Sequence, residues 1–167
     1  MLVAYIGTPY GILTTRWSGL GLYSLDFPAE PLEGSERLDD YEQTRPFAAL
    51  CQLMESYFAG AAVDFRQIPI DWSGYTPFQA AVLRVVHAVP YGQTISYASV
   101  AQQAGMSRAA RAVGNAVGIN RTPILIPCHR AVRADGRVGG FSGGEGWKER
   151  LLATEGVRLY SNGKVAI

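Results

Sequence analysis

The sequence predicts an α/β (α+β) fold of two lobes, a β-rich N-terminal lobe over residues 1–72 and a helical C-terminal lobe over residues 73–167. Three observations support this prediction. β-forming residues alternate with Gly and Pro turn signals at the start of the chain, helical periodicity dominates after residue 76, and a turn-rich stretch, "IPIDWSGYTP", separates the two patterns. A chain of 167 residues is long enough for the two lobes to share one core.

The first lobe is expected to combine short strands with one helix. Residues 1–27 fit two or three antiparallel strands, and the acidic, turn-rich residues 28–45 fit a loop. Apolar residues then recur at three- and four-residue steps before Gly60, which predicts one amphipathic helix. These residues are Phe47, Leu50, Cys51, Met54 and Phe58. Cys51 lies on the apolar face and is interpreted as a buried, inert residue.

The second lobe is expected to contain several short helices and a late hairpin. The "TPFQ" stretch, residues 76–79, forms a capping box with Pro at the first helical position of a helix that stops at Pro90. Ser96 is expected to cap a second helix and Ser107 a third, which runs through "RAARAVGNAVG", residues 108–118. Two short helices joined by a Gly-containing turn are the outline of a helix-turn-helix.

Charge is distributed unevenly between the two parts of the chain. Residues 1–75 carry four Arg or Lys against ten Asp or Glu, whereas residues 76–167 carry eleven against four. A basic second part favours binding to a polyanion. The alternative is two solvated surfaces that happen to differ in charge.

The predicted third helix has an unusually smooth surface, from which Arg108 and Arg111 project. The small residues that make it smooth are Ala109, Ala110, Ala112, Gly114 and Ala116. Such a face permits close backbone approach, and the amides of a capped helix N-terminus attract phosphate. The same face could instead pack tightly against another helix, but the basic lobe favours nucleic acid.

Cysteine usage and hydropathy exclude several classes of protein. The chain has only Cys51 and Cys128, no CxxC pair, and only His87 and His129 as further soft ligands. Neither a disulfide framework nor a structural metal site is expected, and no cofactor is implied. Without an arginine-led apolar N-terminus or an apolar run of transmembrane length, we expect a soluble, cytoplasmic protein with no membrane partner.

The stretch "TPILIPCHRAVR", residues 122–133, places Cys128 beside His129 and Arg130 after a run of apolar β-formers. A free thiol is only slightly ionised at neutral pH, so an efficient nucleophile needs a nearby base or cation. Neighbouring side chains on a strand point to opposite faces, so contact with His129 requires a bridging water or a sharp turn after Pro127. The alternative is a structural cysteine that ends a strand.

The segment from Tyr75 to Gly156 resembles the catalytic domain of the O6-alkylguanine-DNA alkyltransferases, also called methylated-DNA–protein-cysteine methyltransferases. The matching pieces, in the order and spacing of the family, are "TPFQAAVL", "VPYGQTISYASVA", "RAARAVGNAV", "PILIPCHR", "GGFSGG" and "KERLLATEG". The resemblance implies a winged-helix-like catalytic lobe behind a variable first domain. It also implies a monomer that acts on double-stranded DNA bearing O6-alkylguanine, without a cofactor.

The resemblance also implies the chemical roles of individual residues. Cys128 would attack the alkyl carbon on guanine O6 and keep the alkyl group as a thioether, so each molecule would act once. His129 would take the thiol proton through a water, and Glu155 would orient and charge the imidazole. Asn120 would hold the turn that presents the thiol. Tyr97 would donate a proton or hydrogen bond to the departing guanine.

Further residues are implied in binding the substrate. Arg111 would enter the duplex from the minor groove and fill the space vacated by the extruded nucleotide, for which a long, planar cation is suited. The other residues expected to contact DNA are Ser107, Arg108, Ala110 and Gly114. Ser142 would contact the alkylated oxygen, and Ala131 and Gly140 would line the base pocket.

The sequence departs from the family pattern at three positions. Ala131 stands where Val is usual, Arg121 where Pro is common, and Phe141 where the aromatic residue is often Tyr. Ala131 could widen the range of alkyl groups accepted, and Arg121 adds a positive charge close to the active-site turn.

Two other classes of function stay open. A cysteine hydrolase would use a Cys/His pair, but it would need an oxyanion hole and would not explain the smooth helix. A non-catalytic module that senses alkylated bases is the closer rival, although the cysteine is replaced in relatives of that type. Taken singly, Tyr97, Glu155, Asn120 and Ser142 could also be ordinary structural residues.

Overall fold

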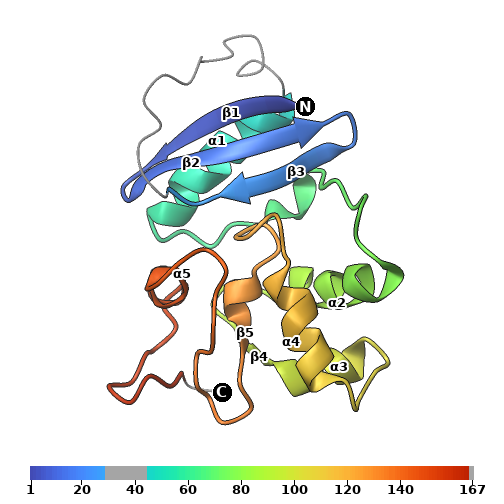
Figure 1. Ribbon diagram of the computed structural model, residues 1–167. Helices are drawn as coiled ribbons and strands as arrows, with labels where there is room; N and C mark the ends of the chain where they lie inside the picture. The colour runs from blue at the N-terminus through green and yellow to red at the C-terminus, as the bar shows by residue number, and fades with distance from the viewer. Residues whose placement is uncertain (29–44, 166–167) are drawn as a thin grey trace.

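The N-terminal lobe of the computed structural model, which describes residues 1–28 and 45–165, contains a small antiparallel sheet (Figure 1). Strands β1 (Leu2–Thr8), β2 (Gly11–Ser18) and β3 (Gly21–Asp26) follow one another in the sheet, which confirms the predicted strands. Helix α1 (Arg45–Phe58) lies across one face of the sheet. The expected acidic loop falls, apart from its ends, outside the described residues.

Helix α1 packs on the sheet through an apolar face that differs in part from the predicted one. It buries four side chains at three- and four-residue steps, namely Phe47, Leu50, Met54 and Tyr57. The rings of Phe47 and Trp17 meet edge to face with centroids 6.3 Å apart. Tyr57 rather than Phe58 completes this face, because it continues the helical repeat from Met54. Cys51 is only partly buried, so the expectation of a fully buried residue is wrong.

After the short helix η1 (Phe65–Gln67), the chain that connects the lobes is hydrogen-bonded to strand β3 at the edge of the sheet. The Leu22 amide donates to the Pro69 carbonyl at 2.8 Å, and the Asp71 amide donates to the Leu22 carbonyl at 2.9 Å. Gly21 has φ +138°, and a Cβ at this position would lie 2.4 Å from the Pro69 oxygen. Only glycine therefore allows this approach of the two backbones.

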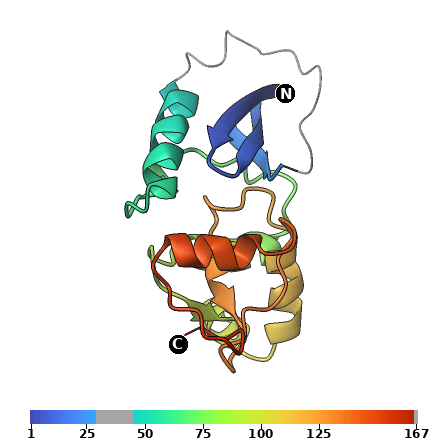
Figure 2. The ribbon, with the colours of Figure 1, turned by 90° about the vertical axis from the view of Figure 1, so that its left-hand side faces the viewer.

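The C-terminal lobe is built from helices around a short parallel strand pair. Helices α2 (Pro77–His87), α3 (Tyr97–Gln103) and α4 (Ala110–Gly118) pack together, while β4 (Ile95–Ser96) pairs with β5 (Ala131–Val132). Helix α5 (Trp147–Thr154) runs across the lobe just below the sheet of the first lobe (Figure 2). The sequence predicted a late hairpin in this lobe. In its last part, isolated antiparallel bridges join Arg137 to Lys164 and Leu159 to Val165.

The predicted helix starts in this lobe are confirmed for α2 and α3 but not for α4. Thr76 forms the capping box of α2, and Ser96 accepts a hydrogen bond from the Ser99 amide at the start of α3. Helix α4 begins at Ala110 without a side-chain cap, so the prediction for Ser107 is wrong. The physical reason is a turn closed by the Ala109 amide and the Met106 carbonyl, at 2.8 Å, which contains Ser107 and delays the helix.

One hydrophobic core runs through both lobes. It joins Trp17 and Leu50 of the first lobe to Val82 and Leu151 of the second. Helix α2 ends at His87, three residues before Pro90, where the sequence predicts its end. Among the described helices, none combines the length and the apolar character needed to span a membrane.

Candidate active site

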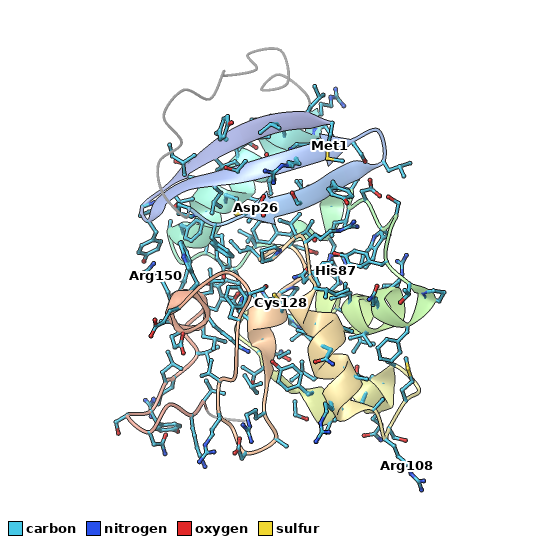
Figure 3. All side chains as sticks on the ribbon, in the orientation of Figure 1. Met1, Asp26, His87, Arg108, Cys128 and Arg150 are labelled. Atoms are coloured by element: carbon cyan, nitrogen blue, oxygen red, sulfur yellow. The ribbon has the colours of Figure 1, made fainter. Side chains whose placement is uncertain are left out.

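Cys128 lies on a turn near the boundary between the two lobes (Figure 3). The preceding run is not a strand: Ile124 has φ 72°, and the Cys128 amide donates to the Ile126 carbonyl at 2.7 Å. A left-handed φ is unfavourable for a β-branched residue, so the surrounding contacts must hold this turn. Cys128 then begins the short helix η2 (Cys128–Arg130), and only 3% of it is exposed.

Asn120 fixes the loop that leads to the thiol. Its Nδ2 donates to the Ile126 carbonyl at 2.8 Å, and its Oδ1 accepts from the Thr122 amide at 3.0 Å. Burial raises the pKa of the Cys128 thiol, while a hydrogen bond with the Asn120 side chain and the charge of Lys148 oppose this rise. The thiol is therefore protonated at rest, and it needs a base to become a nucleophile.

His129 and Glu155 form a buried pair beside this thiol turn. The imidazole Nε2 lies 2.6 Å from Glu155 Oε1, and both side chains are fully buried. Burial lowers the pKa of His129, and Glu155 only partly offsets this effect. A neutral His129 that donates from Nε2 leaves Nδ1 as a proton acceptor, and Nδ1 is buried without a hydrogen-bond partner among the described residues.

Glu155 is the carboxylate that pairs with Arg130, a partner that the sequence could not identify. Arg130 donates from Nε to Oε2 at 2.9 Å and from Nη2 to Oε1 at 3.0 Å, and also to the Val89 carbonyl. Burial alone would raise the pKa of Glu155, but His129 and Arg130 lower it to about 2. Glu155 is therefore ionised at neutral pH and holds the imidazole in one orientation.

Lys148 is a second buried cation, for which the sequence analysis gave no role. Its Nζ donates to the carbonyls of Ala131 at 2.6 Å and Gly140 at 3.3 Å, and to the Tyr97 hydroxyl at 3.4 Å. Burial lowers the pKa of Lys148 to about 8, and the charge of Cys128 opposes this. The sequence contained a signal for the burial of this lysine. Lys148, Leu151, Leu152 and Glu155 recur at three- and four-residue steps and so share one face of a helix.

A cavity of about 220 Å³ opens beside the thiol. It is lined by Tyr97, Gly114, Val117, Gly118, Cys128, Gly140, Phe141 and Ser142. The cavity thus brings five of the sequence-predicted site residues together, from α3, α4, η2 and the loop before α5. Ala131, with none of its surface exposed, is not among the residues that line this cavity, and its carbonyl accepts a hydrogen bond from Lys148.

The residues expected to contact DNA lie outside this cavity, except for Gly114. Ser107, Arg108, Ala110 and Arg111 are exposed around the start of α4. Arg108 points away from the molecule at the end farthest from the sheet (Figure 3). This surface offers cations to a ligand larger than the cavity.

Arg121 joins the loop before the thiol to the N-terminal lobe. Its guanidinium lies over the rings of Tyr23 at 4.1 Å and Tyr75 at 4.2 Å. Nη2 also donates to the carbonyls of Ser73 at 2.6 Å and Asp71 at 3.2 Å. The positive charge that was expected close to the active-site turn therefore also joins the two lobes.

Metal ligands do not gather in the part of the chain that the structure describes. Residues 1–28 and 45–165 contain no group of three His, Cys, Asp or Glu side chains able to hold an ion. The fold and the site thus define a protein with a buried cysteine, served by an imidazole and a carboxylate, beside a small cavity.

Comparisons with known proteins identify the family of this chain. Residues 77–157 match the family described as 6-O-methylguanine DNA methyltransferase, DNA binding domain. A methylated-DNA–protein-cysteine methyltransferase of Mycolicibacterium paratuberculosis is 39% identical over 90% of this chain and 89% of the relative. A DNA base-flipping protein of Thermus thermophilus is 36% identical over 92% of this chain and 99% of its own length.

Solved structures agree with this assignment. The structure of Mycobacterium tuberculosis OGT in complex with DNA superimposes with a TM-score of 0.74 and 34% identity, covering 92% of this chain and 91% of that chain. The chain belongs to the methylated-DNA–protein-cysteine methyltransferase family, whose enzymes repair DNA by alkyl transfer. DNA is its partner.

Proposed function

We propose that this chain transfers the alkyl group of O6-alkylguanine in double-stranded DNA to Cys128, once per molecule. One observation carries the proposal. The thiol lines the cavity, while the adjacent His129 has Nε2 held by Glu155 and Nδ1 left as a buried acceptor. Such an arrangement supplies a base to a nucleophile whose burial otherwise keeps it protonated.

The proposed reaction is a nucleophilic displacement at the alkyl carbon. His129 Nδ1 takes the thiol proton through a water, and the Cys128 sulfur attacks the alkyl carbon. The bond between that carbon and guanine O6 breaks, and its electron pair stays with the guanine. Tyr97 donates a proton to the guanine and recovers one from the relay, so the thiol proton ends on the repaired base. Glu155 stabilises the imidazolium formed on the way.

Two features of its surroundings bear on the proposed acid role of Tyr97. Burial and the charge of Cys128 raise the pKa of its hydroxyl, which keeps it protonated at rest but makes it a weaker acid. Lys148 donates to the same hydroxyl at 3.4 Å, which stabilises negative charge that develops there. Ser142 also lines the cavity and is proposed to contact the alkylated oxygen.

We propose further that the start of α4 approaches the minor groove. An O6-alkyl carbon lies inside the duplex, so the nucleotide must leave the stack at a cost of about a few kcal/mol. Arg111 is exposed on this helix, and a guanidinium can replace the lost stacking. Ala110 and Gly114 allow close approach, and Ser107 and Arg108 are placed to contact phosphate.

Four further properties are proposals of the same kind. The protein is expected to act as a monomer and in the cytoplasm. The division between residues 72 and 73 also stays a prediction, because the lobes share one core. Repeated turnover is not expected, because a carbon–sulfur thioether offers no easy route back to the thiol.

A damage-sensing module is the alternative function that the comparisons keep in view, since one relative is named a DNA base-flipping protein. The test is base analysis of an excess of duplex with one O6-methylguanine, after mixing with the unmodified protein or with the Cys128→Ser variant. Transfer predicts guanine in amounts equal to active protein and none with the variant. Binding by both proteins without guanine formation would support the sensing module.

A further inference from the structure

We propose that Tyr57, a residue of the N-terminal lobe, is a positioning residue for the alkyl transfer because it holds the Glu155 carboxylate against His129. This inference rests on the proposed function and adds a contribution from the first lobe to the active site. The hydroxyl of Tyr57 donates to Glu155 Oε1 at 2.8 Å, across 98 residues of sequence. It also lies 3.5 Å from His129 Nε2.

The Tyr57 ring is fixed where it can make this contact. None of the residue is exposed, and it is one of the four buried residues of α1. Its ring meets those of Phe58, Phe65 and Tyr91 edge to face, with centroids 5.3, 5.7 and 6.0 Å away. A ring enclosed in this way delivers its hydroxyl to one point, so the hydrogen bond costs little additional conformational entropy.

Tyr57 is one of five donors to the Glu155 carboxylate among the described residues. Oε1 accepts from Tyr57, from His129 at 2.6 Å and from Arg130 Nη2 at 3.0 Å. Oε2 accepts from Arg130 Nε at 2.9 Å and from the Gly92 amide at 3.0 Å. A buried carboxylate with its lone pairs occupied has one orientation, and the imidazole that it holds then also has one.

The Tyr57 hydroxyl also shares the charge of the carboxylate. Burial, and then the charge of Glu155, raise the pKa of Tyr57 far above its ordinary value, so Tyr57 acts as a hydrogen-bond donor and keeps its proton. The titratable and charged groups that contact or act on the His129 side chain are Glu155, Arg130, Lys148 and Tyr57. Without the hydroxyl, Glu155 would direct more of its charge at His129 and favour the imidazolium.

An imidazolium cannot take the thiol proton, so loss of the hydroxyl should lower the fraction of His129 that is neutral and able to act as a base at acidic pH. The Tyr57→Phe substitution removes one oxygen and keeps the ring. We expect the pKa of His129 to rise by about 0.5–1. The acid limb of the pH–rate profile for methyl transfer should move upward equally. The transfer rate on that limb should fall about three- to tenfold.

The experiment measures single-turnover methyl transfer from duplex O6-methylguanine across pH, together with NMR titration of the histidines. The full chain contains only two histidines, so His87 serves as an internal reference. Tyr91→Phe is the matched control: its hydroxyl donates to the carbonyls of Gly60 at 3.2 Å and Thr154 at 3.0 Å. It should lower the melting temperature without moving the titration of His129.

The outcomes separate this inference from the proposed function. A shift confined to His129 in the Tyr57 variant, with the matching shift of the rate profile, supports it. Superimposable profiles for that variant and the unmodified chain would overturn it alone and leave Tyr57 as packing. Absence of transfer by the unmodified chain would overturn the proposed function, and the positioning role with it.

Discussion

The Glu155→Gln substitution is the most severe test of the buried hydrogen-bond network that joins Glu155 to His129 and Arg130. Glutamine keeps the shape of the side chain but removes its charge and presents an amide donor where the carboxylate had only acceptors. Arg130, whose side chain is 7% exposed, would then be a buried cation without its partner. His129 would lose the anion that orients it and stabilises its charged form.

Two estimates of the loss of folding stability in this variant agree. Breaking a buried ion pair on one side costs about 3–5 kcal/mol. The lowering of the Glu155 pKa from 4.5 to about 2 corresponds to about 3 kcal/mol. For a domain of this size, 1 kcal/mol shifts the melting temperature by about 2–4 °C, so a decrease of about 6–20 °C is expected.

The contribution of Glu155 to the free energy of unfolding depends on pH in a predictable direction. Because the pKa of Glu155 is lower in the folded state, its contribution is complete above pH 4.5 and is lost as the pH falls toward about 2. The stability difference between the unmodified chain and the variant should therefore shrink over this window. Thermal denaturation at several pH values measures it, and the exposed Glu149→Gln on the same helix should change stability by less than about 0.5 kcal/mol.

The Glu155 variant should also slow methyl transfer while leaving affinity for duplex DNA nearly unchanged. The reasoning would be refuted by a melting temperature within about 2 °C of the unmodified chain at pH 7. A transfer rate equal to that of the unmodified chain would refute the role of Glu155 in the relay.

Two further predictions concern surfaces outside the relay. Arg111→Ala should slow transfer from duplex O6-methylguanine but not from the free methylated base, because only the duplex requires extrusion of the nucleotide. Rate measurements on the two substrates in parallel test this. An equal loss of rate on both would contradict the role of Arg111. Arg121→Met should lower the free energy of unfolding by about 1–3 kcal/mol, because it removes the stacking on Tyr23 and Tyr75. Guanidinium denaturation measures this loss, and an unchanged midpoint would contradict the role of Arg121 in joining the lobes.

Local signals in the sequence predicted much of the fold. Alternating β-formers located the three strands, and the capping box at Thr76 located the start of α2. The same kind of signal failed at Ser107, because a serine before a helical pattern can equally sit within the preceding turn. The β-formers before Cys128 form a turn instead of a strand, because the contacts of Asn120 override local propensity.

The parts of the site that the sequence missed depend on contacts between distant segments. Tyr57 reaches Glu155 only because the end of α1 meets the second lobe, which no local pattern specifies. Lys148 was passed over because lysine is ordinarily exposed, although its helical face includes Glu155. Arg121 was noted as a departure from the family, but its two tyrosine partners lie on different parts of the chain.

The central claim is that Cys128 receives the alkyl group. Intact-protein and peptide mass spectrometry, after mixing with excess duplex that contains one O6-methylguanine, tests it most directly. We predict one added CH₂ on the peptide containing Cys128, guanine restored in equal amount, and no second turnover. Tight binding of the damaged duplex with no change in protein mass would contradict the claim and the relay of Cys128, His129 and Glu155.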